Sequence, residues 1–170
     1  ISGDTVDMVV QNNSLKYSAL DSNGDCQGTS LVVHGKHHNL LIDGNYVEED
    51  IGMAGQGCWG IAVDGGYSSA EQFSQVTISN NTVKNVGNLA IGVGSCQNCT
   101  IENNVIQQFQ AIGTRGIMAP DRVRGGGDAI STDIVVRNNT LYYGPNSSGI
   151  GITVKDEGNN HQIISNVIYY

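Results

Sequence analysis

The sequence predicts an all-β chain that winds into a parallel β-solenoid, with successive coils stacked on one another. One short phrase, an apolar triplet followed by a polar turn and an asparagine, occurs six times. Between these phrases, aliphatic residues alternate with small or polar ones, which is typical of strands. The closest two asparagines of this phrase, Asn81 and Asn104, are only 23 residues apart, which leaves room for three short strands but not for an ordinary helix. A single coil of this kind has no core, so its apolar residues can be buried only by stacking.

The strands around each asparagine are the first repeated element. Each copy has an aliphatic residue three positions before its asparagine, so the same side of the strand faces the core every time. We therefore expect a strand, a turn and a second strand within each copy. The copies are Met8–Leu15, Leu40–Val47, Val76–Val83, Cys99–Ile106, Ile134–Leu141 and His161–Ile168.

The asparagine predicts the turn between those strands. Asparagine tolerates the left-handed backbone that a sharp turn requires. Its side-chain amide both donates and accepts hydrogen bonds, so the same turn in neighbouring coils can be joined amide to amide. We therefore predict a buried ladder of asparagines. Its members are Asn13, Asn45, Asn81, Asn104, Asn139 and Asn166.

A further strand is expected between the asparagine copies. The segments are Leu31–Val33, Gly60–Val63, Ala90–Val93, Gly116–Met118 and Gly149–Ile152. If alternation is strict and Ile61 and Val63 point inward, Gly60 points outward, and the same rule places Gly116 on the outer face. The outer face of this strand set then carries few titratable groups.

Three phrases carry a resemblance to a known family. VTISNNTVKNV, AIGVGSCQNCTIENNVI and IVVRNNTLYYG resemble the right-handed parallel β-helix repeats of the pectin-lyase-like superfamily. The resemblance implies one right-handed parallel β-helix of about five to six coils, with an internal asparagine ladder, over nearly all of residues 1–170. That superfamily contains polysaccharide lyases, hydrolases and epimerases as well as tailspikes, adhesins and non-catalytic surface proteins. The resemblance thus implies contact with polysaccharide without fixing an activity.

The resemblance does not extend to hydrolase motifs. Ile91–Ser95 is similar to a segment of polygalacturonase-type hydrolases, but Leu89 and Ala90 replace the histidine expected just upstream. The sequence also lacks a paired Asp-Asp and an Asn-Thr-Asp motif. Polygalacturonase-type hydrolysis is therefore disfavoured.

Composition limits the partners. The chain has 16 acidic against 8 basic residues and a formal net charge of −8, which argues against a nucleic-acid partner. No apolar run approaches the length of a membrane span. The first phrase begins at Met8 without a preceding cap, and the last ends in the expected strand at Tyr169 and Tyr170. We therefore expect an internal fragment of a longer solenoid, or self-association through uncapped coil ends.

Charged residues cluster in the sequence at the margin of the further strand and in the loop that follows it. Elimination from a uronate needs a base for the α-proton and a cation or metal ion to neutralise the carboxylate. A solvated loop edge is the alternative interpretation, and whether the chain is an enzyme stays open. The candidate catalytic residues are Lys36, Asp64, Arg122, Arg124 and Lys155. The candidate substrate-binding residues are His34, Asp121, Asp156 and Glu157.

Two segments raise the question of a metal. His34–His38 contains three histidines, but no cysteine or acid completes a recognisable ligand spacing, so the metal ligands stay unknown. Asp21–Asp25 has the oxygen spacing that begins a calcium loop, but Cys26 stands where the glycine belongs and Val32 where the bidentate acid belongs. An Asx-rich turn is favoured there, with calcium as the alternative.

The four cysteines indicate an oxidising location. Cys26 and Cys58 both lie shortly before the further strand of consecutive coils, so stacking can join them in a disulfide. Cys96 and Cys99 predict a local disulfide or a buried cysteine in the stack. Both readings favour an extracellular or cell-surface protein.

The expected function follows from these features together. We expect a secreted or surface β-helix that binds or processes polysaccharide, as a lyase-like module if it is catalytic. The alternative is a non-catalytic structural or receptor-binding β-helix, similar to an adhesin or a phage tailspike. Aromatic side chains that could stack on sugar rings are Trp59, Tyr67, Tyr142 and Tyr143.

Overall fold

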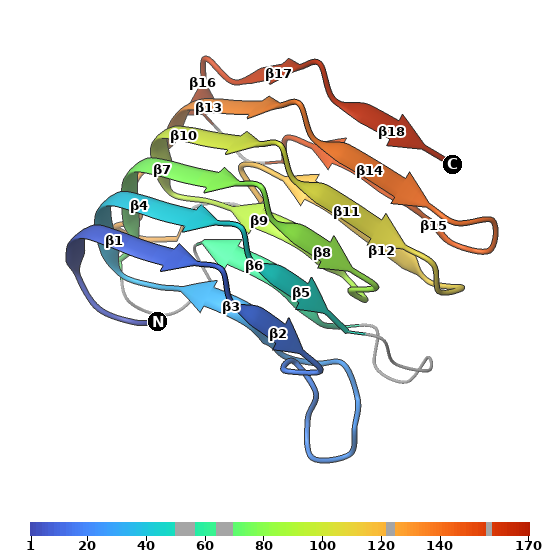
Figure 1. Cartoon of the computed structure of the whole chain (residues 1–170). Helices are drawn as coiled ribbons and strands as arrows, with labels where there is room; N and C mark the ends of the chain where they lie inside the picture. Colours follow the sequence, from blue (N-terminus) through green and yellow to red (C-terminus); the bar gives the residue numbers. More distant parts are fainter. Residues whose placement is uncertain (50–56, 64–69, 122–124, 156–157) are drawn as a thin grey trace.

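The computed structural model describes residues 1–49, 57–63, 70–121, 125–155 and 158–170. Every element of secondary structure assigned in these ranges is a β-strand, and the strands form three sheets (Figure 1). The seven-stranded sheet contains β1 (Thr5–Gln11), β4 (Lys36–Asp43), β7 (Gln72–Ser79), β10 (Cys96–Glu102), β13 (Ser131–Arg137), β16 (Gly158–Asn159) and β17 (Gln162–Ile164). The six-stranded sheet contains β2 (Ser14–Lys16), β5 (Tyr46–Glu48), β8 (Thr82–Lys84), β11 (Val105–Gln108), β14 (Thr140–Tyr143) and β18 (Val167–Tyr169). The five-stranded sheet contains β3 (Thr29–Val33), β6 (Trp59–Val63), β9 (Leu89–Val93), β12 (Gly113–Met118) and β15 (Ser148–Thr153).

The chain passes through the three sheets in turn and then repeats the circuit. Neighbouring strands within each sheet come from successive circuits and pair in parallel, for example β1 with β4 and β4 with β7. Figure 1 shows the resulting stack, with the N-terminal strands at one end and β17 and β18 at the other. The prediction of an all-β chain of stacked parallel strands is confirmed.

Strand register places equivalent aliphatic residues in columns that run through the stack. Ile42 pairs with Ile78, Ile78 with Ile101, and Ile101 with Val136, and these four side chains are at most 1% exposed. Burial of one such side chain contributes about 1.5 to 3 kcal/mol. The core is therefore a set of such columns between the three sheets, and it fixes the register because a one-residue slip would turn every aliphatic residue outward.

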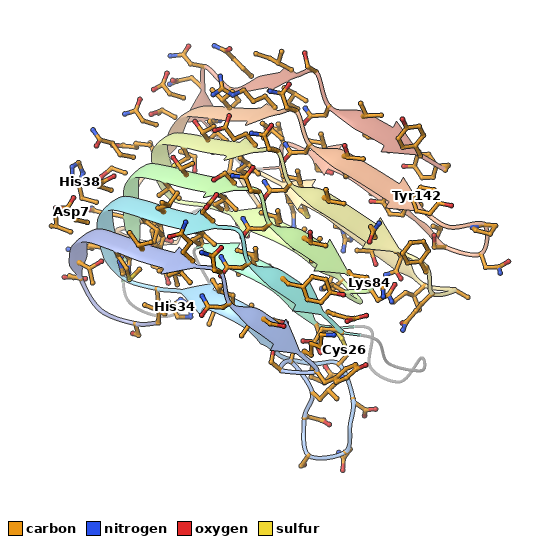
Figure 2. The ribbon with its side chains drawn as sticks, viewed as in Figure 1. Asp7, Cys26, His34, His38, Lys84 and Tyr142 are labelled. Carbon is orange, nitrogen blue, oxygen red and sulfur yellow. A yellow bond between two sulfur atoms is a disulfide. The ribbon has the colours of Figure 1, made fainter. Side chains whose placement is uncertain are left out.

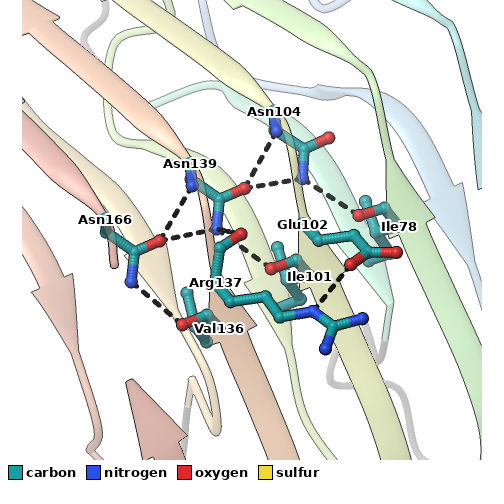
Figure 3. A network of polar contacts seen from close by, with 8 residues as sticks. All are labelled: Ile78, Ile101, Glu102, Asn104, Val136, Arg137, Asn139 and Asn166. Carbon is teal, nitrogen blue, oxygen red and sulfur yellow. Dashed lines mark hydrogen bonds and ion pairs between the residues drawn. The ribbon is translucent and has the colours of Figure 1, made fainter. Parts of the chain in front are cut away.

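The ladder asparagines, one in each circuit, form a continuous series of hydrogen bonds, called here the asparagine column. Each backbone N and each Nδ2 donates to the Oδ1 of the next asparagine, as in Asn104 to Asn139, where both distances are 3.0 Å. The second Nδ2 hydrogen reaches a strand carbonyl, such as that of Ile78 for Asn104, at 2.9 Å (Figure 3). The four inner asparagines are at most 1% exposed, so these amides satisfy one another in a dry interior.

The left-handed backbone of this turn belongs to a different residue from the one predicted. Asn80 has φ 55° and Asn138 has φ 55°, whereas the column asparagines that follow them are not in this conformation. The residue before the column asparagine therefore makes the turn, and the column asparagine supplies the hydrogen bonds. The same region of φ recurs within the long strands, as at Asn39 (58°) and Asn98 (57°), and bends them.

Strict alternation in the five-stranded sheet is also wrong. A Cβ on Gly60 would lie 2.7 Å from Val83 Cγ1 of the six-stranded sheet, and a Cβ on Gly116 would overlap Leu141 of the same sheet. Both glycines therefore face the interior rather than solvent. They lie where the two sheets approach too closely for a side chain, which is a physical reason for glycine there.

Two disulfides are present. Cys26 and Cys58 are joined across neighbouring circuits, with their Cα atoms 4.8 Å apart. Cys96 and Cys99 are joined within β10 and bracket the bend at Asn98. All four cysteine side chains are buried.

Candidate functional site

The described candidate residues gather best at the turn between β3 and β4, called here the histidine corner (His34, Lys36, His37 and His38). The turn depends on Gly35, which has φ +105° and whose added Cβ would overlap the backbone of Gly3. Only glycine adopts this conformation at so close a contact. The turn thereby brings Lys36 and the histidines onto the edge between two sheets.

His34 faces a buried carboxylate from the next circuit. Its Nδ1 lies 3.1 Å from Glu71 Oε1, and the two residues are 9% and 0% exposed. Glu71 is itself held through its backbone, since its N donates to Asp128 Oδ1 and its carbonyl accepts from Ala129 N, both at 2.9 Å. The imidazole is therefore oriented by a fixed carboxylate, an arrangement that determines which ring nitrogen carries a proton.

His37 has a structural place in the corner. Its Nε2 donates to the His34 carbonyl at 2.6 Å, and in the neutral ring its Nδ1 accepts from Thr5 Oγ1 at 2.7 Å. Its ring stacks on Phe73, with centroids 5.5 Å apart and planes 6° from parallel. With both nitrogens engaged and only 2% of the residue exposed, His37 fixes the start of β4 rather than presenting a reactive group.

A groove of about 340 Å³ crosses β1, β4 and β7 at this corner. Its lining is Asp4, Thr5, Val6, Lys36, His37, His38, Gln72 and Ser74. Lys36 and His38 are exposed, and His38 Nδ1 lies 2.9 Å from Ser74 Oγ. Figure 2 shows His38 beside Asp7 at the bend of the long strands. The groove therefore offers one ammonium group, one exposed imidazole at His38, a carboxylate at Asp4 and neutral donors along a stretch of neighbouring coils.

Asp121 and Lys155 lie on the same edge of the stack but farther along it. Asp121 follows β12, is 2% exposed and places Oδ2 where a Cβ on Gly92 would lie 2.7 Å away. Lys155 is exposed, and its backbone N donates to Pro120 O at 3.1 Å. Since β3 and β12 are three strands apart, Asp121 and His34 belong to levels separated by about 14 Å.

The predicted stripe is thus placed only in part. His34 and Lys36 share one turn, but Lys36 lines the groove whereas His34 is buried against Glu71, and Asp121 and Lys155 lie at other levels of the same edge. The other candidates lie outside the described residues. They are Asp64, Arg122, Arg124, Asp156 and Glu157, and the aromatic Tyr67 is outside as well.

The Asp21–Asp25 segment forms a turn closed by hydrogen bonds from backbone N atoms to the Asp21 side chain. Asp21 Oδ1 accepts from the backbone N of Asn23 at 2.8 Å and of Asp25 at 2.9 Å, which is the Asx-rich turn expected for this loop. Among the residues that the structure describes, no three histidine, cysteine, aspartate or glutamate side chains group as ligands for a metal ion.

The aromatic candidates separate into exposed and buried residues. Tyr142 is 37% exposed and lies beside Phe109, which is 47% exposed, with ring centroids 5.4 Å apart. Tyr143 is buried and donates to the Ile150 carbonyl at 2.9 Å, so its prediction as a sugar-stacking residue is wrong. Burial raises the pKa of the Tyr143 hydroxyl far above its usual value. Figure 2 shows Tyr142 on the opposite side of the stack from His38.

Sequence reasoning missed two acidic residues at the end of β5, Glu48 within the strand and Glu49 directly after it. Glu49 is fully buried, and its Oε1 accepts from Ser30 Oγ at 2.7 Å and from Ser18 and Ala19. Glu48 lies in register between two lysines, Lys16 and Lys84, with N–O distances of 3.2 and 2.6 Å. Hydrogen bonds, first from Lys84 and then from Tyr46, lower the pKa of Glu48 to about 2.

No similar protein indicates which chemistry these groups perform. Comparison of the chain with models of protein families, with curated proteins and with solved structures finds no match. Within the described ranges, no helix has the length and apolar character needed to cross a membrane. The function must therefore be argued from the geometry of the site.

Proposed function

We propose that this chain is a right-handed parallel β-helix of the pectin-lyase-like kind, working outside the cell or at its surface, and that it binds polysaccharide in the groove at the histidine corner. The observation that carries this proposal is the 340 Å³ groove with Lys36 and His38 exposed in its lining. An open groove across parallel strands suits an extended polar chain better than a compact metabolite.

The lining favours a glycan that carries carboxylates. The Lys36 ammonium can pair with a uronate carboxylate, while Gln72, Ser74 and His38 can bind hydroxyl groups. Asp4 also lines the groove, and its Oδ1 already accepts from the Lys36 backbone N at 2.9 Å. Because the protein carries a net charge of −8, binding of an acidic glycan should be weak and should depend on this local cation.

If the groove also processes its ligand, the reaction best matched to it is elimination from a uronate. Such a reaction needs a base for the α-proton and a cation or metal ion that neutralises the carboxylate. Lys36 would be the cation and His38 the base, since both are exposed in the groove lining. Calcium bound together with the glycan would be an alternative source of the positive charge.

The test exposes the protein to pectate, alginate, chondroitin and a neutral glycan, with and without calcium. Binding is followed by calorimetry, and elimination by the ultraviolet absorbance of unsaturated uronate alongside reducing ends. Lys36→Ala should weaken binding of the acidic glycans at least tenfold, and His38→Ala should abolish any elimination. Arg137→Ala is the matched control, because Arg137 is an exposed cation of the same sheet outside the groove lining. Equal losses in the Lys36 and Arg137 variants would refute the groove as the binding site.

A non-catalytic structural or receptor-binding role is the second candidate. The asparagine column and the buried aliphatic columns favour it, because they make a stiff rod whose inner residues serve stability alone. In that case all glycans would remain intact. Either a glycan would bind at Tyr142 and Phe109, so that Tyr142→Ala weakens its binding, or no glycan would bind at all.

A further inference from the structure

The outer side of the seven-stranded sheet carries a column of polar side chains in register. The strands β4, β7, β10 and β13 lie side by side there (Figure 1). Each has a paired strand on both sides, so the exposure of this face does not depend on the ends of the stack. One outward-facing residue from each strand forms what is called here the outer column. Its members are His38, Ser74, Gln97 and Thr132.

A bend in each strand turns a second polar side chain outward beside the first. In β4, His37 and Leu40 are buried, whereas His38 and Asn39 between them are exposed. Two consecutive residues of a regular strand would point to opposite faces, so the left-handed residue doubles the side chains that face solvent. The residues at the bends, called here the bend column, have φ between 54° and 58°. They are Asn39, Gln75, Asn98 and Asp133.

The polar character of the outer column is not required by the fold. Val6 occupies the same column in β1, so an apolar side chain is compatible with this position. Within the described part of the chain, no hydrogen bond occupies the side chains of Gln75, Asn98 and Thr132. Their amide and hydroxyl groups can both donate and accept, which suits the hydroxyl groups of a sugar.

The two columns continue the groove of the histidine corner. His38 and Ser74 line the groove, and Gln97 and Thr132 follow them along the stack at about 4.8 Å per strand. This step is close to the length of one sugar residue in an extended glycan. Given the polysaccharide binding proposed above, on which this step rests, we propose that the glycan runs along the stack, at right angles to the strands. One sugar residue then lies over each of β4, β7, β10 and β13.

Charge along this path defines the class of glycan. Lys36 is exposed at the level of β4, and the half-buried Asp133 lies at the level of β13. Ser74 and Gln97, between them, are neutral. A uronate is therefore attracted at the first level and repelled at the last. The ligand is a heteroglycan with a uronate over β4 and uncharged sugars over the other three strands, rather than a polyuronate.

A length series separates this path from binding in the groove alone. The probes are gluco- and manno-oligosaccharides of two to six residues, neutral or with one uronate at the reducing or the non-reducing end, and oligogalacturonates of the same lengths. Calorimetry should show affinity for one uronate-ended series rising about two- to tenfold per added residue, the gain from one net hydrogen bond, up to four residues. Longer members should bind no more tightly.

Variants beyond the groove lining test the individual levels. Gln97→Ala and Thr132→Ala should each weaken the four-residue ligand about two- to tenfold and leave the two-residue ligand unchanged. Lys36→Ala should weaken every uronate-ended ligand. Gln107→Ala is the matched control, because Gln107 is a half-buried glutamine of β11 in the six-stranded sheet. Melting curves check that each variant folds.

A gain of binding provides the sharpest test. Asp133→Asn removes the repulsion and keeps a residue that tolerates the left-handed backbone, so the four-residue oligogalacturonate should bind more tightly to it. Loss of binding in Lys36→Ala, with affinity level beyond two residues and Gln97→Ala without effect, would keep the groove and overturn the path along the stack. Equal losses in Gln97→Ala and Gln107→Ala would also overturn it. Absence of binding by every oligosaccharide would refute the proposed function as well.

Discussion

Removal of one inner asparagine should destabilise the protein more than any single hydrogen bond would suggest. Asn104 is fully buried, and its side chain makes four hydrogen bonds. Its Oδ1 accepts from Asn81 N and Nδ2 at 2.9 Å, while its Nδ2 donates to Asn139 Oδ1 at 3.0 Å and to Ile78 O at 2.9 Å. Asn104→Ala leaves these partners in a dry interior.

The magnitude follows from the groups left without a partner. A buried donor or acceptor that loses its hydrogen bond costs about 1 to 3 kcal/mol. Asn139 Oδ1 still accepts from the Asn104 backbone N, and Asn81 Nδ2 still reaches Ile42 O, so two of the four partners are only partly orphaned. The backbone N of Asn81 and the carbonyl of Ile78 lose the bonds that Asn104 supplies. We expect Asn104→Ala to cost about 3 to 5 kcal/mol of unfolding free energy.

Asn166 provides the matched control. It occupies the same position in the column but is only half-buried, so water can replace the bonds that Asn166→Ala removes. We expect a cost of about 1 to 2 kcal/mol there. Urea unfolding at constant m-value measures both variants. An Asn104→Ala cost below that of Asn166→Ala would refute the view that burial makes these bonds important.

Further predictions concern the cross-link, an ion pair and a close contact. The Cys26–Cys58 disulfide, with a sequence separation of 32, should contribute about 3 to 4 kcal/mol, so Cys26→Ser with Cys58→Ser should lower the denaturation midpoint accordingly. Because the folded pKa of Glu48 is lowered to about 2, its contribution is fully present above pH 4.5 and is lost as pH falls toward 2. It should amount to no more than about 3 kcal/mol, and Glu48→Gln should flatten that part of the stability curve, whereas a parallel curve would contradict the assignment. Gly116→Ala should cost about 1 to 3 kcal/mol through overlap with Leu141, while Gly126→Ala, where a Cβ meets nothing, should be silent in the same thermal melt.

The strands and their register are the part of the fold that the sequence predicts well. Positions such as Ile42, Ile78 and Ile101 recur at one offset from an asparagine, and only stacking in register can bury all of them. The sequence predicts the left-handed backbone at the column asparagine, whereas it lies at the residue before it. Since Asn80 and Asn81 are both asparagines, composition cannot tell which adopts the left-handed backbone and which turns its amide inward.

The buried polar contacts are the part that sequence patterns cannot supply. Glu71 meets His34 across 37 residues, a separation at which no local pattern of the sequence indicates a contact. Glu49 follows another acid and reads as part of a solvated loop. In the folded chain, however, donors from Ser18, Ala19 and Ser30 converge on it from two other segments.

These differences indicate where function resides in such a stack. The aliphatic columns and the asparagine column repeat the same buried contacts in every circuit, so a substitution there alters stability without changing the surface. The edge after the five-stranded sheet differs from circuit to circuit, with His34 at β3 and Asp121 at β12. Within the described part of that edge, the histidine corner combines a glycine-dependent turn, an oriented imidazole and an open groove. Substitutions of Lys36 and His38 should therefore change binding while leaving the unfolding midpoint nearly constant, and the reverse should hold for Asn104.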